Sequence, residues 1–303
     1  EVALDDARAA DIRHAPIEER VHPTRADRSC DFPRHSGFYL GDLTFALCRT
    51  GRAEFAAQMW AYLDYWWTKR DSRGLLRIES RSPEADAHFH ETNAPGQTLS
   101  LATSLLEGAA LLEATQPALA AAMRERAGVY LDGFFAAPHD PDNGVFVILS
   151  SCGANEPKQT MPIWGSRYGL WPAAYVALTC LCAYRLTGDD RLLRWAAAAG
   201  RGYAAQPFPA DVAVPAMDTG LGLGLLADLY AVTGDGRWLD AARALAGVLL
   251  PIYCEARLPR GAAGIGWYES QMGPGFLLHG LARTALLAED REACPLAADY
   301  TAR

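Results

Sequence analysis

The sequence predicts an all-α fold, an (α/α)n toroid of about five helical hairpins with long loops on one face. The first observation is a repeat: residues 182–203 ("CAYRLTGDDRLLRWAAAAGRGY") resemble residues 228–249 ("DLYAVTGDGRWLDAARALAGVL"). Each stretch is an apolar helix, a Thr-Gly-Asp turn and an amphipathic helix, and the turns lie 46 residues apart, at Thr187 and Thr233. Paired helices with such a period are typical of solenoids and closed toroids. The second observation is that turns within pairs are short, whereas connections between pairs are long.

Weaker copies of the hairpin lie at 45–66 and 108–131. The Gly of the Thr-Gly turns suits the left-handed residue that ends a helix, and the Asp that follows it can cap the next helix. Pro117 suits the first turn of a helix, where the N–H groups lack intrahelical partners. We therefore expect nine helices, at roughly 37–50, 52–69, 97–114, 117–136, 170–187, 189–205, 219–233, 236–252 and 272–288.

Strand signals are sparse, and "NGVFVILSS" at 143–151 is the best of them. Residues 1–36 are expected to be an N-terminal extension and 37–303 the toroid domain. A further helix at 3–13 would then precede the first hairpin.

The long connections are unusually rich in Trp, Tyr and His. Variable solvated loops are rich in Lys, Ser and Glu instead, and function usually lies on loops held by a rigid scaffold. In a ring of antiparallel hairpins, all the between-pair loops fall on one face. We therefore predict a functional face made of Arg34, His35, Tyr39, His88, His90, Glu91, Asn93, Trp164, Arg167, Tyr168, Asp218, Trp267, Tyr268 and Glu269.

Composition excludes several classes of function. The net charge of −8 and the lack of a basic stripe argue against a nucleic-acid partner. Apolar runs are interrupted well before the roughly 20 residues of a membrane span, so no membrane partner is expected. The seven scattered cysteines form no CxxC pair, which argues against a structural zinc site and favours a reducing, cytoplasmic compartment. Signatures of triad hydrolases and phosphate loops are absent too.

The stretch "MDTGLGLGLLADLYAVTGDGRWLDAA" (217–242) resembles the carbohydrate-active α/α toroids. These comprise unsaturated glucuronyl hydrolases, N-acylglucosamine 2-epimerases, glucuronyl C5-epimerases and toroidal polysaccharide lyases. The resemblance implies a saccharide substrate, with a uronic acid in several of these families. In the hydrolases the Asp before the small-residue helix acts as acid/base, and this role carries over only to Asp218. The second Asp of the hydrolase motif has no clear counterpart, and nearly five hairpins are visible where many relatives have six.

Glycoside hydrolysis needs two carboxyl groups, about 5–5.5 Å apart for retention and about 6.5–9.5 Å for inversion. The candidates are Asp218, Glu269 and Glu91, and Asp218 has the alternative role of a helix N-cap. Trp267 and Tyr268 would stack on a sugar ring beside Glu269.

A lyase or epimerase needs a base that removes the proton next to a carbonyl, and groups that neutralise the resulting charge. His90 or Tyr268 would be the base, and Arg167 and Asn93 would neutralise the charge. Arg167 suits a two-pronged grip on a uronate. Its neighbours Trp164 and Tyr168 either bind sugar or pack the loop.

Two further interpretations of the predicted face stay open. His88 and His90 alternate and would chelate a metal from extended backbone, but no third His supports this, so neither a metal nor a cofactor is expected. His88 is better interpreted as a supporting residue. The second interpretation belongs to a different class of function: a non-catalytic helical-repeat module that binds peptides. Oligomeric state is not indicated by the sequence.

Overall fold

The computed structural model describes residues 30–80, 87–166, 170–209, 211–265, 273–292, 294 and 296. Its contacts divide the chain into two compact units. The described part of the first unit is 30–138 and Leu149–Lys158; the second unit is His139–Ile148 and the chain from Gln159 onward. No helix in the described residues is long and apolar enough to span a membrane.

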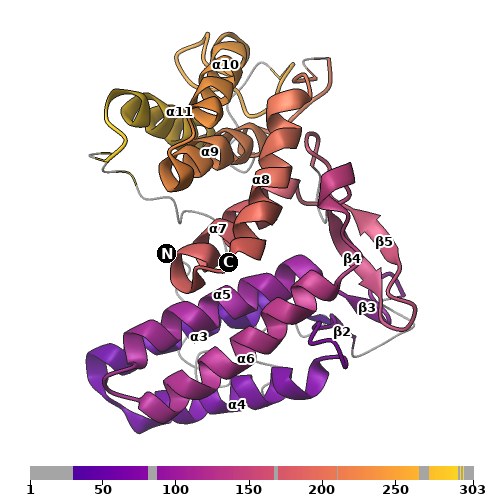
Figure 1. Ribbon diagram of the computed structural model, residues 1–303, viewed down its shortest axis with the longest axis vertical. Coiled ribbons are helices and arrows are strands. Elements are labelled where there is room, and N and C mark those ends of the chain that lie inside the picture. Colours follow the sequence, from indigo (N-terminus) through magenta and orange to yellow (C-terminus); the bar gives the residue numbers. More distant parts are fainter. Residues whose placement is uncertain are drawn as a thin grey trace, which may run out of the picture. The chain divides into compact units, whose positions relative to one another are not determined.

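The first unit is built from two helical hairpins, α3 (Pro33–Thr50) with α4 (Ala53–Lys69), and α5 (Pro95–Leu112) with α6 (Pro117–Ala136). Within the unit α3 packs along α5, and α4 along α6, as Figure 1 shows. Burial of α5 on nearly all sides explains its run of Ala, Leu, Ser and Thr, since few of its positions face water.

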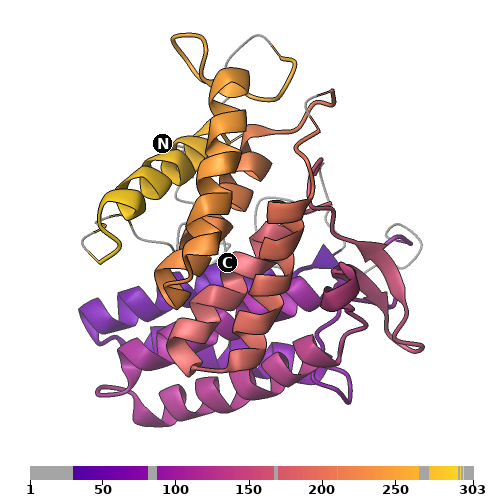
Figure 2. The ribbon, with the colours of Figure 1, turned by 45° about the horizontal axis from the view of Figure 1, so that its top comes forward.

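The second unit contains α7 (Ala173–Thr187), α8 (Asp190–Ala205), α9 (Ala216–Thr233), α10 (Gly236–Tyr253) and α11 (Pro274–Glu289). The helix α9 packs against both α10 and α11, which are orange and yellow in Figure 2. The apolar helices α7 and α9 are buried on nearly all sides, whereas α8 buries one stripe. This division agrees with the expected difference between first and second helices of a pair.

All nine predicted helices are confirmed, and their ends follow the predicted signals. Gly188 and Gly234 both have φ 70°, the left-handed conformation that Gly adopts without strain. The next residues, Asp189 and Asp235, cap α8 and α10 through side-chain bonds to backbone N–H groups. Local chemistry therefore decided where these hairpins turn.

One expected boundary was wrong. Arg34, His35 and Tyr39 were assigned to a long loop, but they lie on α3, which begins at Pro33. Proline fits the first helical turn because its fixed φ is helical and its missing N–H has no partner there. The polar "PRHSG" run is thus the first turn of a helix.

Short strands support the long connections. β1 (Cys30–Asp31) pairs antiparallel with β2 (Glu79–Ser80). A second sheet has the order β3 (Thr92–Asn93), β4 (Val147–Ser151), β5 (Pro157–Thr160). The predicted strand at 143–151 is confirmed for residues 147–151. Its partner β3 was not predicted, because two residues are too few for a periodic signal.

Close helix packing in each unit depends on a glycine. A Cβ on Gly220 of α9 would lie 2.2 Å from the backbone carbon of Phe276 on α11. A Cβ on Gly133 of α6 would lie 2.3 Å from backbone carbon of Gly74. Any larger residue at either position would force the backbones apart.

Candidate functional site

Five of the predicted site residues lie outside the described residues: Arg167, Tyr168, Trp267, Tyr268 and Glu269. Their roles stay predictions. The other nine are divided between the units, with Trp164 and Asp218 in the second and the rest in the first.

In the first unit a turn at 87–91 precedes β3 and carries His88, His90 and Glu91 with exposed side chains. Glu91 has φ 49°, a left-handed conformation that few non-glycine residues adopt. Such a conformation persists only where the surrounding structure imposes it, and it is common at functional sites.

The backbone of this turn is held from two neighbouring strands. The Lys158 Nζ donates to the His90 carbonyl oxygen at 3.2 Å and to Thr92 Oγ1 at 2.9 Å. The backbone N–H of Cys152 donates to the Glu91 carbonyl oxygen at 3.0 Å. The main chain is therefore fixed while the His90 and Glu91 side chains remain exposed.

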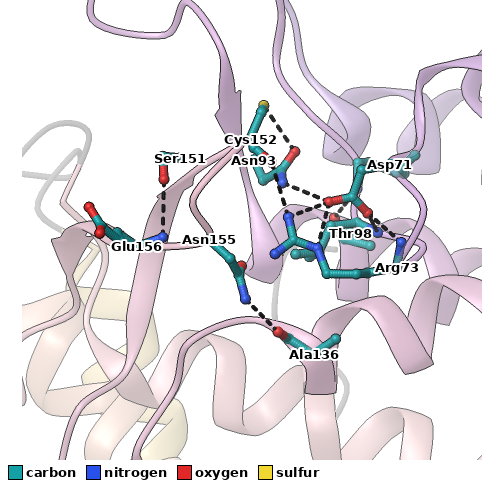
Figure 3. A network of polar contacts seen from close by, with 11 residues as sticks. Asp71, Arg73, Asn93, Thr98, Ala136, Ser151, Cys152, Asn155 and Glu156 are labelled. Atoms are coloured by element: carbon teal, nitrogen blue, oxygen red, sulfur yellow. Dashed lines mark hydrogen bonds and ion pairs between the residues drawn. The ribbon is translucent and has the colours of Figure 1, made fainter.

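A partly buried polar network adjoins the turn (Figure 3). The Asn93 amide Nδ2 donates to Asp71 Oδ2 at 3.1 Å, and the Cys152 thiol donates to Asn93 Oδ1 at 3.3 Å. Arg73 Nε donates to Asp71 Oδ2 at 2.9 Å, and its Nη2 reaches the Cys152 carbonyl oxygen at 3.2 Å. Asn93 is fully buried in this network, so its contact with substrate stays a prediction.

Burial raises the pKa of the Cys152 thiol. The nearby Asp71 and Glu91 charges raise this pKa further, and Arg77 and Lys158 oppose the rise. A protonated thiol is a hydrogen-bond donor and a poor nucleophile. Cys152 therefore serves the network as a donor.

Aromatic contacts join the start of α3 to the same turn. Phe32 contacts His35 at 5.4 Å and Phe89 at 5.5 Å between ring centroids, and Phe89 contacts His88 at 4.8 Å. The structure thus connects the predicted residues His35 and His88 through two phenylalanines.

Arg34 and Tyr39 face other neighbours on α3 and α4. The Arg34 guanidinium lies 5.3 Å from the Phe38 ring, and Tyr39 stacks on Tyr62 of α4 at 6.0 Å. Burial raises the pKa of Tyr39, and Asp42 raises it further. A role for Arg34 or Tyr39 in binding substrate stays a prediction.

In the second unit Asp218 lies in the first turn of α9 and is fully buried. It is not the N-cap, which is Pro215, so the capping interpretation was wrong. The Ser166 backbone N–H donates to Asp218 Oδ2 at 2.7 Å, and the Ser166 hydroxyl donates to Oδ1.

The environment of Asp218 favours its neutral form. Burial raises the pKa of this carboxyl above 3.8, although hydrogen bonds from Ser166 and the Gly165 backbone oppose the rise. Its negative charge in turn adds to the burial that raises the pKa of Tyr203 and of Tyr253. Asp218 therefore combines burial with neutral hydrogen-bond donors.

Trp164 directly precedes the Gly165–Ser166 segment that bonds to this carboxyl. Its ring contacts Tyr203 at 4.7 Å and Phe208 at 5.3 Å, both edge to face. A Cβ on Gly222 of α9 would lie 2.6 Å from Tyr203 and 3.2 Å from Trp164. These contacts favour the loop-packing interpretation of Trp164 over sugar stacking.

The long loops of the second unit converge at the start of α9. The Ala216 N–H donates to the Gly261 carbonyl oxygen at 2.8 Å, and the Ala263 N–H to that of Val214 at 3.0 Å. Gly273, which precedes α11, lies against Met217. Within this unit, the predicted gathering of between-pair loops is confirmed.

The described residues contain no group of three or more His, Cys, Asp or Glu side chains placed to hold a metal ion. Sequence reasoning missed Asp71, Arg73, Lys158 and Ser166, which support the candidate residues. For Asp71 and Arg73 the available signal was the Asp-x-Arg spacing at 71–73, which recurs at 189–191 and 235–237 in the described part of the chain.

No family model and no curated protein matches the chain. Solved structures do. A D-mannose isomerase has a TM-score of 0.59 at 11% identity, covering 89% of this chain and 74% of the other. A cellobiose 2-epimerase from Bacillus thermoamylovorans has 0.56 at 11%, covering 84% and 72%. An unsaturated glucuronyl hydrolase specific for heparin has 0.54 at 14%, covering 85% and 76%.

The glucuronyl hydrolase carries the name of one of the families that residues 217–242 resemble. The cellobiose 2-epimerase, like the N-acylglucosamine 2-epimerases, is named as a sugar epimerase. At these identities the likeness establishes the fold alone. The chain has the all-α fold of the α/α toroid enzymes, as its sequence predicted.

Proposed function

We propose that this protein is a carbohydrate-active enzyme that hydrolyses a glycosidic bond in a uronate-containing saccharide. Asp218 is the proposed general acid. The observation that carries this role is its burial, which raises the pKa of a carboxyl held by neutral donors. A general acid must hold its proton near working pH, and burial is the usual means.

Asp218 has no exposed surface while Ser166 bonds to it. Proton donation to a substrate therefore requires the Gly165–Ser166 segment to withdraw from the carboxyl. Ser166 makes two hydrogen bonds to the carboxyl, so two polar groups of the substrate must replace them for the number of hydrogen bonds to be conserved.

Glu91 and Glu269 are the candidates that the sequence offers for the second carboxyl. Glu91 is exposed on a turn with a fixed backbone, which suits a base or nucleophile that a substrate must reach. Glu269 lies outside the described residues and stands on the sequence alone, as do Trp267 and Tyr268 for sugar stacking.

The test is a turnover assay with saturated and unsaturated uronic-acid disaccharides, with Asp218→Asn and Glu91→Gln as variants. Asn keeps the shape of Asp218 and an oxygen for the Ser166 N–H, so the fold should survive. Removal of the acid should lower kcat by about a hundredfold or more. Turnover within twofold of wild type in both variants would remove these residues from the mechanism, and no turnover by wild type would favour the binding-module alternative.

Sugar epimerisation or isomerisation is the second candidate. The exposed His90 is a suitable base, and structures with this fold include proteins named as an isomerase and an epimerase. The distinguishing measurement uses mannose, cellobiose and a uronic-acid oligosaccharide in D₂O. Deuterium in a product of unchanged length indicates epimerisation; new reducing ends indicate hydrolysis; ultraviolet absorbance of an unsaturated product indicates a lyase.

A further inference from the structure

Within the residues that the structure describes, three Asp-x-Arg pairs share the same internal geometry. At 189–191 and 235–237 the Arg backbone N–H donates to Oδ1 of the Asp, at 2.9 and 3.1 Å, and Arg Nε donates to Oδ2, at 2.9 and 3.1 Å. At 71–73 the same bonds measure 3.0 and 2.9 Å. The three pairs are therefore matched in their local chemistry.

Their surroundings differ. Asp189 and Asp235 cap helices on exposed turns, and the described side-chain bonds of each carboxylate go to its own arginine. Asp71 caps no helix. Its carboxylate also accepts from the Leu75 N–H at 3.0 Å and from Asn93 Nδ2 at 3.1 Å.

The additional bonds of the 71–73 pair run to β3 and to Cys152, the residue that follows β4. One arm goes from Asp71 to Asn93 on β3, two residues after Glu91. The other goes from Arg73 Nη2 to the Cys152 carbonyl oxygen, and the N–H of Cys152 holds the Glu91 carbonyl oxygen. Figure 3 shows the Asp71 carboxylate where the two arms meet.

The two arms support the left-handed backbone conformation of Glu91. The left-handed backbone of Glu91, with φ 49°, is strained for a residue with a Cβ. The bond from Cys152 and the anchored strand β3 fix the residues on either side of that conformation. Loss of the anchor should let Glu91 relax and turn its side chain away.

We infer that Asp71, acting through Asn93 and Arg73, is the positioning residue that holds Glu91 in its working orientation. The inference rests on the proposed role of Glu91 in catalysis. It assigns Asp71 no contact with substrate. Substitution of Asp71 should therefore lower kcat, and this loss should disappear when Glu91 itself is replaced.

The kinetic test compares Asp71→Asn with the matched control Asp189→Asn, using the uronic-acid disaccharide that wild type cleaves. Misplacement of a catalytic group should lower kcat about tenfold or more in Asp71→Asn and leave KM within about twofold. Asp189→Asn should change neither. In a Glu91→Gln background, Asp71→Asn should lower kcat by less than about twofold further, because coupled residues are not additive.

The kinetic test distinguishes failure of the proposed catalytic role of Glu91 from failure of the inferred positioning role of Asp71. Full activity in Glu91→Gln overturns the catalytic role of Glu91. Reduced activity in Glu91→Gln together with multiplicative effects in the double variant overturns the positioning role of Asp71 alone.

A readout that needs no substrate is amide hydrogen exchange at Cys152, whose N–H bonds to Glu91. Asp71→Asn should speed this exchange at least about tenfold, and Asp189→Asn should leave it unchanged. Equal exchange in the two variants overturns the inference. If Asp71→Asn does not fold, Arg73→Lys replaces it, with Arg191→Lys as control, because Lys keeps the charge and loses the two-pronged contact.

Discussion

The two ends of α9 each hold a fully buried aspartate, and their partners differ in kind. Asp228, toward the C-terminal end, forms ion pairs with Arg185 of α7 at 2.8 Å and with Arg283 of α11. Asp218, in the first turn, accepts hydrogen bonds from Ser166 and Gly165, which are neutral. The helix, the residue type and the burial are shared, so the difference lies in the neighbours.

This difference separates a structural carboxylate from a candidate acid. A buried carboxylate between two guanidinium groups has its charge balanced by ion pairs, and here it connects three helices. A buried carboxyl held by neutral donors gains from taking up a proton. The comparison teaches that burial alone does not identify a catalytic aspartate; the charge of its partners does.

The largest effect is expected from Asp228→Ala. Arg283 has only 5% of its side chain exposed, so the variant leaves a buried cation without its counter-charge. The free energy of unfolding should fall by about 3–5 kcal/mol, measured by urea denaturation. Asp228→Leu combined with Arg283→Met should recover most of the loss. A loss below about 1 kcal/mol would mean that the triad is not structural.

Asp218→Ala should cost less, about 1–3 kcal/mol, because it leaves neutral donors unsatisfied and no buried charge unpaired. The same urea experiment measures it. Asp218→Asn should cost less again, since one amide oxygen still accepts from Ser166. If Asp218→Ala proved as costly as Asp228→Ala, the proposed difference between the two ends of α9 would fail.

The pH dependence of stability gives a third comparison. The pKa of Asp218 is raised above 3.8, so its contribution to stability is present below pH 3.8 and is lost as pH rises through its folded pKa. Asp218→Asn should therefore gain stability relative to wild type as pH rises in denaturation curves from about pH 4 to 7.

Asp235 is the control of opposite sign. Its hydrogen bonds with Arg237 lower the pKa of this carboxyl below 3.8, so its contribution is present above pH 3.8 and is lost as pH falls through the folded pKa. The same slope for Asp218→Asn and Asp235→Asn would contradict the assignment of Asp218 as a carboxyl with a raised pKa.

The smallest effect concerns Glu91 in the first unit, a carboxylate that is exposed instead of buried. Glu91→Gly should raise the free energy of unfolding by up to about 1 kcal/mol, because glycine adopts φ 49° without strain. It should also abolish turnover if Glu91 is catalytic. Glu156→Gly on the neighbouring exposed loop is the control and should not stabilise. A destabilised Glu91→Gly would show that the side chain contributes contacts of its own.

Much of the molecule follows from local sequence. The Gly188–Asp189 and Gly234–Asp235 turns, together with Pro117, placed helix ends within a few residues, since capping depends on residues next to one another. The fold class followed from the repeat of these hairpins. The start of α3 was misjudged because the polar residues of its first turn look like a loop.

The chemistry of the candidate residues was decided by tertiary structure. Asp218 and Asp228 are both aspartates in one apolar helix, and only the folding of α7, α11 and the loop at Ser166 gives them different partners. The three Asp-x-Arg pairs are likewise equivalent in sequence, and pairing of β3 with β4 places one of them beneath Glu91. Charge and hydrogen bonding act over a few ångströms in space, so residues far apart in sequence decide what each carboxyl does.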